Sequence, residues 1–336
     1  MTEYNFDVFK WSKDGKIIKA DVHREALKPD EVLVKITHAG LCGTDLHFKG
    51  MDMVPGHEGA GIVESVGSAV STFKVGDRAG WGYLHNSCLY CDDCLSGNEI
   101  FCAKGETYGG ADAHQGGFGS YAIWKAAFLF HIPDAIPSSH AAPLMCAGAT
   151  VFGAMEMHGV RATDRVGIVG IGGLGHLAIQ FAAKMGCQVV VFSGTLAKEA
   201  EARALGANEF YATRQPDALK DVKPVNHIFV TSSRMPDWQQ FMPVLAPRAA
   251  IYPMTVSPGD FSIPCMPLLR NGWRVQGTFC ASRGVHVKML RFAAQHKIQP
   301  VIQEFPLTAE GIEEATAKLE KGEVRYRAVL VAPGQD

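Results

Sequence analysis

The sequence predicts an α/β protein of two domains, a β-rich domain and a doubly wound domain with a parallel sheet. With 336 residues, the chain is longer than a typical single domain. Short alternating segments and glycine-rich turns continue to about Ile132, whereas buried strands and helices alternate after about Ala149. The composition, 47% hydrophobic and 20% charged, is ordinary for a globular α/β protein.

The β-rich domain is predicted from its alternation of apolar and polar residues. In EVLVKIT, residues 31–37, the apolar Val32, Val34 and Ile36 fall on one face. This period of two is typical of a half-buried antiparallel strand. We therefore expect a barrel-like front half with long loops.

The doubly wound domain is predicted from strands that alternate with helices. RVGIV, residues 165–169, is a buried strand that leads through a glycine turn into a helix ending near Met185. Two more buried strands are predicted at 188–192 and 227–231, with a helix at 199–207. Such alternation indicates βαβ units on a parallel sheet.

The C-terminal part predicts one more strand and two helices. WRVQGTF, residues 273–279, is the strand, and VKMLRFAAQH, residues 287–296, is the first helix. Thr308 is the predicted N-cap of the second helix, which closes at Gly322.

The charge and the N-terminal residues favour small-molecule partners. A formal charge of −2 provides no overall field that would attract nucleic acid or an anionic membrane. MTEYNFDVFKWSKDGK lacks a signal-peptide pattern, and no uncharged apolar run reaches the roughly 18 residues of a membrane span. We therefore expect a cytoplasmic protein.

Four cysteines, Cys88, Cys91, Cys94 and Cys102, are spaced C-x2-C-x2-C-x7-C. In a reducing compartment this spacing indicates metal ligands, and four thiolates close the tetrahedral shell of a structural zinc. Free thiols, a disulfide pair and an iron–sulfur cluster are the alternatives. The residues between the cysteines are too polar to fold by burial, so we expect metal to hold this segment. We call residues 88–102 the four-cysteine lobe.

Three further residues, Cys42, His57 and Cys146, can supply two thiolates and an imidazole. Taken singly, each is equally well explained as a small buried thiol or a loop histidine. Together they form the ligand set of an open, catalytic zinc, with Glu58 as support or as a transient fourth ligand.

Zinc in such a site acts as a Lewis acid on an alcohol or carbonyl oxygen. Thr44 and His47 are then candidates to relay the released proton. This chemistry requires a group that accepts or donates hydride.

A nicotinamide cofactor, bound at a glycine-rich turn, would supply or accept the hydride. The residues Gly170, Gly172, Gly173, Leu174 and Gly175 belong to GIGGLG, which matches G-x-G-x-x-G between a strand and a helix. Glycines there permit a tight turn, approach of a pyrophosphate and close helix packing. A purely structural turn is the alternative.

The tip of the second strand of this domain favours NADP. It carries Ser193, Thr195 and Lys198, and no acidic residue stands where a ribose-binding carboxylate is expected. Hydroxyls and a cation suit a 2′-phosphate, which a carboxylate would repel. Arg203 is a further candidate, or simply a solvated helix charge.

Assembled in this order, the motifs CGTDLH, VPGHE, PLMCAGATVF, GIGGLG and VRYRAVLV resemble the zinc-dependent medium-chain alcohol dehydrogenases, most closely their cinnamyl alcohol dehydrogenase-like branch. The resemblance covers nearly the whole chain. It implies a GroES-like catalytic domain at 1–148 and 286–336 and a Rossmann NADP-binding domain at 149–285.

The resemblance also implies roles for the candidate residues. It implies catalytic zinc on Cys42, His57 and Cys146 with Glu58 nearby, and structural zinc on the four cysteines of the lobe. Thr150 is then near the nicotinamide, and a homodimer joined through the cofactor domains is expected.

One departure from this branch concerns the substrate entrance. Only fourteen residues separate Cys42 from His57, fewer than the branch usually has, so we expect a wider or differently shaped mouth. Pocket candidates are Phe48, Met53, Trp81 and Phe279, although such side chains are more often plain core.

The function that follows is an NADP(H)-dependent zinc alcohol dehydrogenase or aldehyde reductase acting on aliphatic, allylic or aromatic substrates. The alternatives are a non-catalytic zinc-containing nucleotide-binding protein and an NAD-dependent polyol dehydrogenase. The remaining cysteines, Cys187, Cys265 and Cys280, are expected to be buried thiols.

Overall fold

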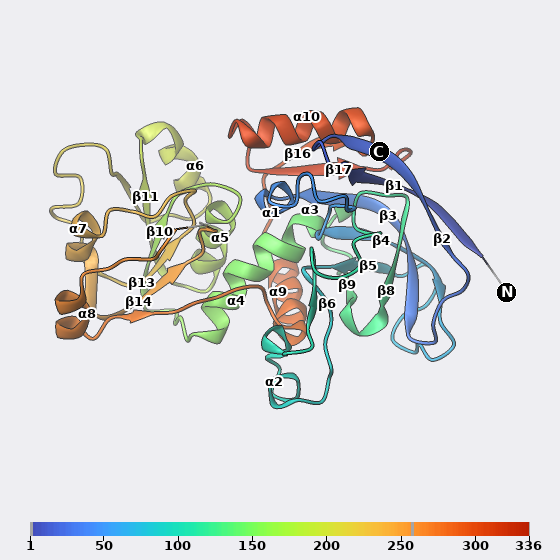
Figure 1. Ribbon diagram of the computed structural model, residues 1–336. Coiled ribbons are helices and arrows are strands. Elements are labelled where there is room, and N and C mark those ends of the chain that lie inside the picture. The colour runs from blue at the N-terminus through green and yellow to red at the C-terminus, as the bar shows by residue number, and fades with distance from the viewer. Residues whose placement is uncertain (1–2, 257–258, 336) are drawn as a thin grey trace. The chain divides into compact units, whose positions relative to one another are not determined.

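The computed structural model describes residues 3–256 and 259–335 and forms two compact units (Figure 1). One unit comprises Met1–Ala149 and Cys280–Asp336, and the other comprises Thr150–Phe279. The second division falls between residues 279 and 280, before the expected residue 285, and Arg283 pairs with Glu99 of the first unit, with 3.2 Å between Nε and Oε1. His286 also bonds within the first unit. Its two ring nitrogens lie 2.9 Å from the Met145 carbonyl oxygen and 3.2 Å from the Ala281 carbonyl oxygen.

A seven-stranded sheet is the centre of the first unit, with most strands in the order β16-β17-β3-β4-β5-β9. β8 and β17 share one edge of β3, β8 pairing with residues 31–35 and β17 with residues 38–41. The strands are β3 (Glu31–Leu41), β4 (Gly59–Val66), β5 (Arg78–Trp81), β8 (Tyr121–Lys125), β9 (Phe130–His131), β16 (Ile302–Pro306) and β17 (Arg327–Val331).

The prediction of a half-buried β3 is wrong in one respect, since both faces of this strand are covered. Val32, Val34 and Ile36 lie in the main core of the unit, as the alternation predicts. Leu33 points the other way and is also buried, because it packs in a second cluster with Phe6, Val8, Val54 and Ile123. A strand between two cores loses its simple alternation.

Two small antiparallel sheets complete the strands of this unit. β1 (Tyr4–Trp11) pairs with β2 (Ile17–Arg24), and β6 (Leu84–Asn86) pairs with β7 (Glu106–Thr107). The helices are α1 (Gly43–Leu46), α2 (Asp92–Leu95), α3 (Ser138–Pro143), α9 (Arg283–His296) and α10 (Ala309–Glu320).

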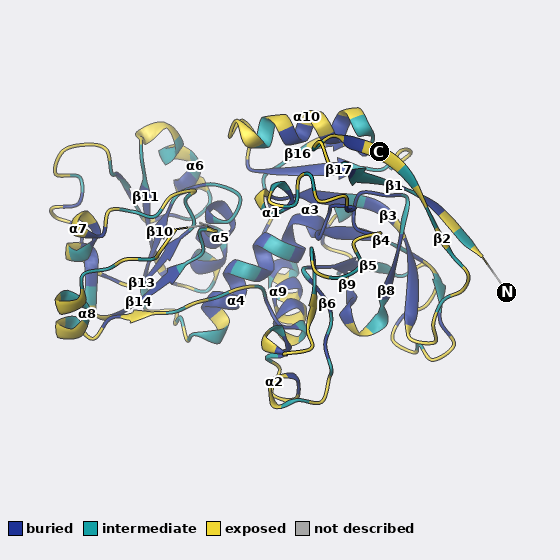
Figure 2. Ribbon diagram, viewed as in Figure 1, coloured by how far each residue is buried: buried dark blue, intermediate teal, exposed yellow. Residues whose placement is uncertain are grey.

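Both predicted C-terminal helices are present. The N-cap prediction is confirmed, since the Thr308 side chain accepts a hydrogen bond from the Gly311 amide. α10 buries Ile312 and Ala315 and exposes its opposite face (Figure 2). α9 begins at Arg283, before the predicted residue 287. Among the described residues, no helix is both long and apolar enough to cross a membrane.

The second unit contains a six-stranded, fully parallel sheet in the order β12-β11-β10-β13-β14-β15. The chain reverses direction across the sheet between β10 and β13, which makes their carboxyl ends the switch point where such sheets bind ligands. The strands are β10 (Arg165–Val169), β11 (Gln188–Ser193), β12 (Glu209–Ala212), β13 (Val225–Val230), β14 (Leu245–Pro253) and β15 (Arg274–Val275).

The helices of this unit are α4 (Ala149–Met157), which starts at the division, α5 (Gly175–Lys184), α6 (Glu199–Ala204), α7 (Trp238–Phe241) and α8 (Cys265–Asn271). The predicted α/β fold class is therefore confirmed, with a β-rich unit and a parallel-sheet unit. The strand predicted at 273–279 is mostly wrong, because only Arg274 and Val275 pair with β14.

Candidate functional site

Four potential metal ligands from three distant segments meet in the first unit. The side chains of Cys42, His57, Glu58 and Cys146 each place one donor atom within 4.8 Å of the others. His57 Nε2 lies 3.3 Å from Cys146 Sγ. Cys42, His57 and Glu58 are buried, and Cys146 is half-buried. We call these four residues the donor cluster.

Local structure explains how each segment reaches the donor cluster. Cys42 follows directly after β3 and is the N-cap of α1. Gly56, with a φ of +100°, turns the chain toward His57 just before β4. Cys146 lies on a π-helical turn at 144–148, an irregularity frequent at functional sites. The His286 ring bonds the adjacent Met145 carbonyl and fixes this turn.

Gly40 makes room for the Glu58 carboxylate. A Cβ atom added at Gly40 would lie 1.9 Å from Glu58 Oε2, a distance that no side chain tolerates. The sequence contains no pattern that singles out this glycine, because the contact joins β3 to the start of β4.

Asp45 anchors the donor cluster, a role that the sequence analysis missed. The carboxylate is fully buried and accepts hydrogen bonds from the Cys42 amide at 2.8 Å and the Gly56 amide at 3.1 Å. It also faces His57 Nδ1 at 3.1 Å, so that Nε2 is left for the donor cluster. The Tyr108 hydroxyl donates to the same carboxylate at 2.7 Å. The only sequence signal for Asp45 is its place within CGTDLH.

Arg327 was also missed, because it stands far away in the sequence on β17. Its guanidinium donates a hydrogen bond to Glu58 Oε1, and both side chains are almost wholly buried. Burial nevertheless raises the pKa of Glu58 to about 7, since loss of hydration outweighs the attraction of Arg327. The neighbouring Cys146 thiol lowers the pKa of Cys42 well below its ordinary value.

The donor cluster fits a zinc ion. Two sulfurs and one imidazole nitrogen are ligands that zinc prefers, and three protein ligands are typical of catalytic zinc. Glu58 Oε2 is buried and has no hydrogen-bond partner among the described residues, so an unused carboxylate oxygen faces the same place. A buried polar atom without a partner is costly, and a cation would satisfy it.

The two relay candidates follow Cys42 in α1 and at its C-cap, at increasing exposure. Thr44 is half-buried, with its hydroxyl 3.7 Å from Cys42 Sγ. His47 is exposed, one helical turn further along. This order suits transfer of a proton from a buried hydroxyl to water, and the roles of both residues stay predictions.

The four cysteines of the lobe also converge. Their sulfurs meet the same 4.8 Å criterion, with 3.5 Å between the sulfurs of Cys91 and Cys94 and 3.8 Å between those of Cys88 and Cys94. The Cys88 amide donates to the sulfur of Cys102 at 3.5 Å. This all-sulfur set fits a closed structural zinc.

That metal holds the four-cysteine lobe stays a prediction, to which the structure adds one ionic anchor. Glu99 is buried and pairs with Arg283 at the start of α9, with 3.2 Å between Oε1 and Nε. Two apolar side chains of the lobe face outward, since Tyr90 is 84% exposed and Leu95 is 72% exposed, whereas Ile100 is half-buried against the main core of the unit. The lobe therefore has one buried ionic anchor but no apolar core of its own.

Of the remaining cysteines, Cys187 is buried and Cys280 is half-buried. The expectation of a buried thiol is wrong for Cys265, which is exposed at the start of α8. A cysteine at the first turn of a surface helix has no core to enter.

In the second unit, the three glycines of the cofactor motif play three different parts. Gly170 has a φ of +93° and makes the tight turn after β10. A Cβ at Gly175 would lie 2.0 Å from the Gly170 carbonyl oxygen, so helix α5 packs directly on the strand. A Cβ at Gly172 would meet no atom within 4 Å, so its backbone is open to a ligand. These are the parts such glycines play in dinucleotide sites.

The other two residues of the predicted cofactor turn, Gly173 and Leu174, precede α5, with Leu174 at its N-cap. Thr150 lies half-buried on α4. The cofactor-binding roles of these residues stay predictions.

The tip of β11 presents the predicted polar side chains and one cation that the sequence analysis missed. Ser193 ends the strand, and Lys198 Nζ donates to the Ile171 carbonyl of the glycine turn at 2.9 Å. The guanidinium of Arg214 packs over Gly194, since a Cβ there would lie 3.2 Å from Arg214 Nε. Arg214 follows the next strand, so only the parallel pairing of β11 with β12 brings it to this tip.

Arg203, the further candidate, is engaged elsewhere. Its guanidinium pairs with Glu199 at 2.8 Å and donates to the Asn208 carbonyl at 3.1 Å. It is therefore a helix-surface charge, which was the alternative interpretation.

The pocket candidates from the sequence differ in their surroundings. Trp81 is fully buried in the main core and stacks on Trp124, so it belongs to the packing of the sheet. Met53 is also buried, Phe48 packs its edge against Tyr108, and Phe279 is 53% exposed.

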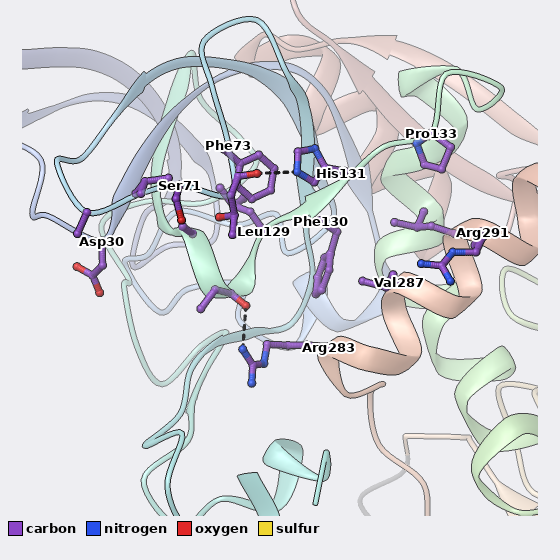
Figure 3. A pocket seen from close by; sticks show the side chains of 16 residues that line it. Asp30, Ser71, Phe73, Leu129, Phe130, His131, Pro133, Arg283, Val287 and Arg291 are labelled. Carbon is purple, nitrogen blue, oxygen red and sulfur yellow. Dashed lines mark hydrogen bonds between the residues drawn. The ribbon is translucent and has the colours of Figure 1, made fainter. Parts of the chain in front are cut away.

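A separate cavity of about 720 Å³ opens in the first unit between β9 and α9 (Figure 3). Its walls include Phe73, Leu129, Phe130 and Val287, with Arg283 at one side. None of the residues that line it belongs to the donor cluster, so we assign it no part in catalysis.

Comparison with known proteins agrees with this geometry. Residues 28–134 match the family model described as alcohol dehydrogenase GroES-like domain, and residues 173–295 match the one described as zinc-binding dehydrogenase. Aldehyde reductase AdhA from Synechocystis is 33% identical, over 94% of this chain and 96% of the relative.

Two similar solved structures are cinnamyl alcohol dehydrogenases. The enzyme from Sorghum bicolor superposes with a TM-score of 0.91 at 29% identity, covering 98% of each chain. The enzyme from Helicobacter pylori, complexed with NADP(H), gives a TM-score of 0.88 at 28% identity, covering 98% of this chain and 99% of that one. The chain therefore belongs to the zinc-binding medium-chain alcohol dehydrogenase family, on its cinnamyl alcohol dehydrogenase-like branch, and is an alcohol or aldehyde dehydrogenase.

Proposed function

We propose that this protein is a zinc-dependent dehydrogenase that uses NADP(H) to interconvert primary alcohols and aldehydes of aliphatic, allylic or aromatic type. The observation that carries the proposal is the donor cluster, in which Cys42, His57 and Cys146 converge with Glu58 from three segments of the first unit. Zinc bound there supplies Lewis acidity toward the substrate oxygen, and a nicotinamide supplies or takes up hydride.

The residues of the donor cluster and its support prepare the site before substrate binds. Cys42, His57 and Cys146 would hold the metal, and Asp45 fixes the His57 ring so that Nε2 faces inward. Arg327 keeps Glu58 beside the cluster, where it can support the metal or take a coordination place transiently.

The proton that accompanies hydride transfer would move along the side chains of α1. The Thr44 hydroxyl, beside Cys42, exchanges a proton with the substrate oxygen. His47 passes that proton to or from water, because its side chain is exposed. In aldehyde reduction the proton travels inward, and in alcohol oxidation it travels outward.

In the second unit, the open backbone at Gly172 supports binding of a pyrophosphate at the start of α5. Ser193, Thr195 and Lys198 would read a 2′-phosphate, and we add Arg214 because its guanidinium covers the tip of β11. The complex of the similar Helicobacter pylori enzyme with NADP(H) supports the same choice.

The resemblance and the edge of the parallel sheet support a homodimer joined through the second unit. β15 is the last strand of the sheet, and the nearby side chains of Met266, Leu269 and Val275 are exposed. A strand edge beside exposed apolar side chains is a typical interface between copies of a chain. Light scattering after size exclusion should give twice the mass of the chain.

The proposed activity is tested with an aldehyde panel that runs from aliphatic to cinnamyl substrates. The zinc-replete protein should oxidise NADPH in the presence of at least one aldehyde, followed by absorbance, with NADH as the control. Absence of turnover with every aldehyde would contradict the dehydrogenase chemistry, whereas a higher kcat/KM with NADH would contradict only the cofactor preference.

A further inference from the structure

A short ribbon connects the four-cysteine lobe to the donor cluster. β6 and β7 pair as antiparallel strands through two residue pairs, Leu84 with Thr107 and Asn86 with Glu106. The lobe is the connection between these strands, so the first and last cysteines stand at one end of the ribbon. In Figure 1 the chain leaves the body of the first unit through β6 and continues to α2, within the lobe.

The other end of the same ribbon carries two tyrosines that contact a metal-ligand candidate. Tyr83 precedes β6 and Tyr108 follows β7, and the Tyr108 amide donates to the Tyr83 carbonyl at 2.9 Å. Both rings lie against the His57 imidazole, with centroid distances of 4.7 Å for Tyr108 and 5.6 Å for Tyr83. The ribbon therefore has the lobe at one end and His57 at the other.

Tyr108 reaches His57 through a hydrogen bond as well as through its ring. Its hydroxyl donates to Asp45 Oδ1 at 2.7 Å, and the same oxygen is 3.1 Å from His57 Nδ1. Tyr108 is 3% exposed, and Phe48 packs against its ring at 5.0 Å. Because the orientation of Asp45 sets the orientation of the imidazole, the Tyr108 hydroxyl fixes His57 indirectly.

We propose that Tyr108 is a positioning residue that couples the four-cysteine lobe to the metal ligand His57. The inference rests on the proposed function, since it requires metal at both clusters. A two-stranded ribbon held by only two residue pairs has little stability of its own. Order at the lobe end therefore decides whether Tyr108 is held where its hydroxyl meets Asp45.

The first test removes only the hydroxyl, with Tyr108→Phe in the full chain. We expect one of two bound zinc ions to pass to a chromogenic chelator about tenfold faster or more, the usual scale for loss of an outer hydrogen bond at a metal site. The visible spectrum of cobalt-substituted protein should also change, because His57 is reoriented. Tyr121→Phe, on β8 away from both clusters, is the matched control and should leave both readouts unchanged.

The outcome of this test separates the inference from the proposed function. Unchanged zinc release and an unchanged cobalt spectrum in Tyr108→Phe would overturn the positioning role while the wild type still binds two zinc ions. A wild type that binds one zinc ion, in the lobe, would instead overturn the proposed function and this inference with it.

The coupling itself is tested by loosening the lobe with and without the Tyr108 hydroxyl. Cys94→Ser should speed zinc loss from the donor cluster in the wild type and add little in Tyr108→Phe. Ser87→Ala is the milder variant if Cys94→Ser does not fold, since the Ser87 hydroxyl faces Cys94 Sγ at 3.3 Å. Fully additive effects would show that the lobe does not act through Tyr108.

Discussion

Arg327 and Glu58 form an ion pair in the interior of the first unit, with 5% and 0% of their side chains exposed. The pair joins β17, from the C-terminal part of the chain, to the residue next to His57. Because both side chains are buried, each charge depends on its partner. The C-terminal strand thereby contributes to the donor cluster without supplying a ligand.

Removal of one member of this pair should destabilise the fold strongly. In the zinc-free protein, Arg327→Leu leaves the buried Glu58 carboxylate without its cation and should lower the free energy of unfolding by about 3–5 kcal/mol. Denaturant unfolding measures the change. Arg203→Ala, which removes a surface pair with Glu199, is the control and should cost at most about 1 kcal/mol. Equal effects of the two substitutions would contradict the structural role of Arg327.

The glycines of the cofactor turn should separate stability from binding. Gly172→Ala adds a methyl group where no atom lies within 4 Å, so the fold should be retained while the KM for NADPH rises. Gly175→Ala places a methyl group 2.0 Å from the Gly170 carbonyl oxygen and should lower the melting temperature. Thermal unfolding and coenzyme kinetics on both variants check the distinction, which fails if Gly172→Ala unfolds and Gly175→Ala does not.

The tip of β11 should decide which coenzyme is used. Ser193→Asp puts a carboxylate beside the expected 2′-phosphate and should move the ratio of kcat/KM values toward NADH by about tenfold or more. A ratio that stays as in the wild type would show that the phosphate is not read at this residue.

Arg214 should contribute to the same preference from the neighbouring strand. Arg214→Ala should raise the KM for NADPH about tenfold, the equivalent of one lost hydrogen bond to a charged group, and leave the KM for NADH nearly unchanged. Arg203→Ala is again the matched control, because its guanidinium is engaged by Glu199 and Asn208. An equal rise for both coenzymes would point to a structural role instead.

His38 should make the fold sensitive to acid. Burial, with a smaller contribution from Arg78, lowers the pKa of His38 from 6.5 to about 4. The folded state therefore binds fewer protons than the unfolded state, so unfolding free energy is lost as the pH falls from about 6.5 toward 4. His38→Asn should reduce this loss, as measured by denaturant unfolding across that range. Identical pH profiles of the two proteins would contradict the shift.

Much of the fold followed from periodicity and glycine placement. The strand at 165–169, the turn after it and the Thr308 cap are local patterns, and the structure has them where they were expected. The short length of β15 could not be predicted. Residues 273–279 are strand-like in sequence, but how many of them form a strand depends on pairing with β14, and only two residues pair. Exposure of Cys265 likewise depends on where α8 lies, which local sequence does not specify.

The donor residues were predictable by type and spacing, whereas the residues that support them were not. Cysteine and histidine are ordinary metal ligands, so Cys42 and His57 stood out by their chemistry. Asp45, Tyr108 and Arg327 act through hydrogen bonds to residues up to 269 positions away, and only the folded chain reveals those contacts. Arg214 was missed for the same reason.

The most direct test of the open metal site is the zinc content of the wild type and of two cysteine variants, measured together with turnover. We expect two zinc ions per subunit in the wild type, and one in Cys146→Ser with no remaining turnover. Cys94→Ser should chiefly lower the melting temperature. A wild type with a single zinc confined to the lobe, or a Cys146→Ser protein that keeps two zinc ions and full activity, would contradict this expectation.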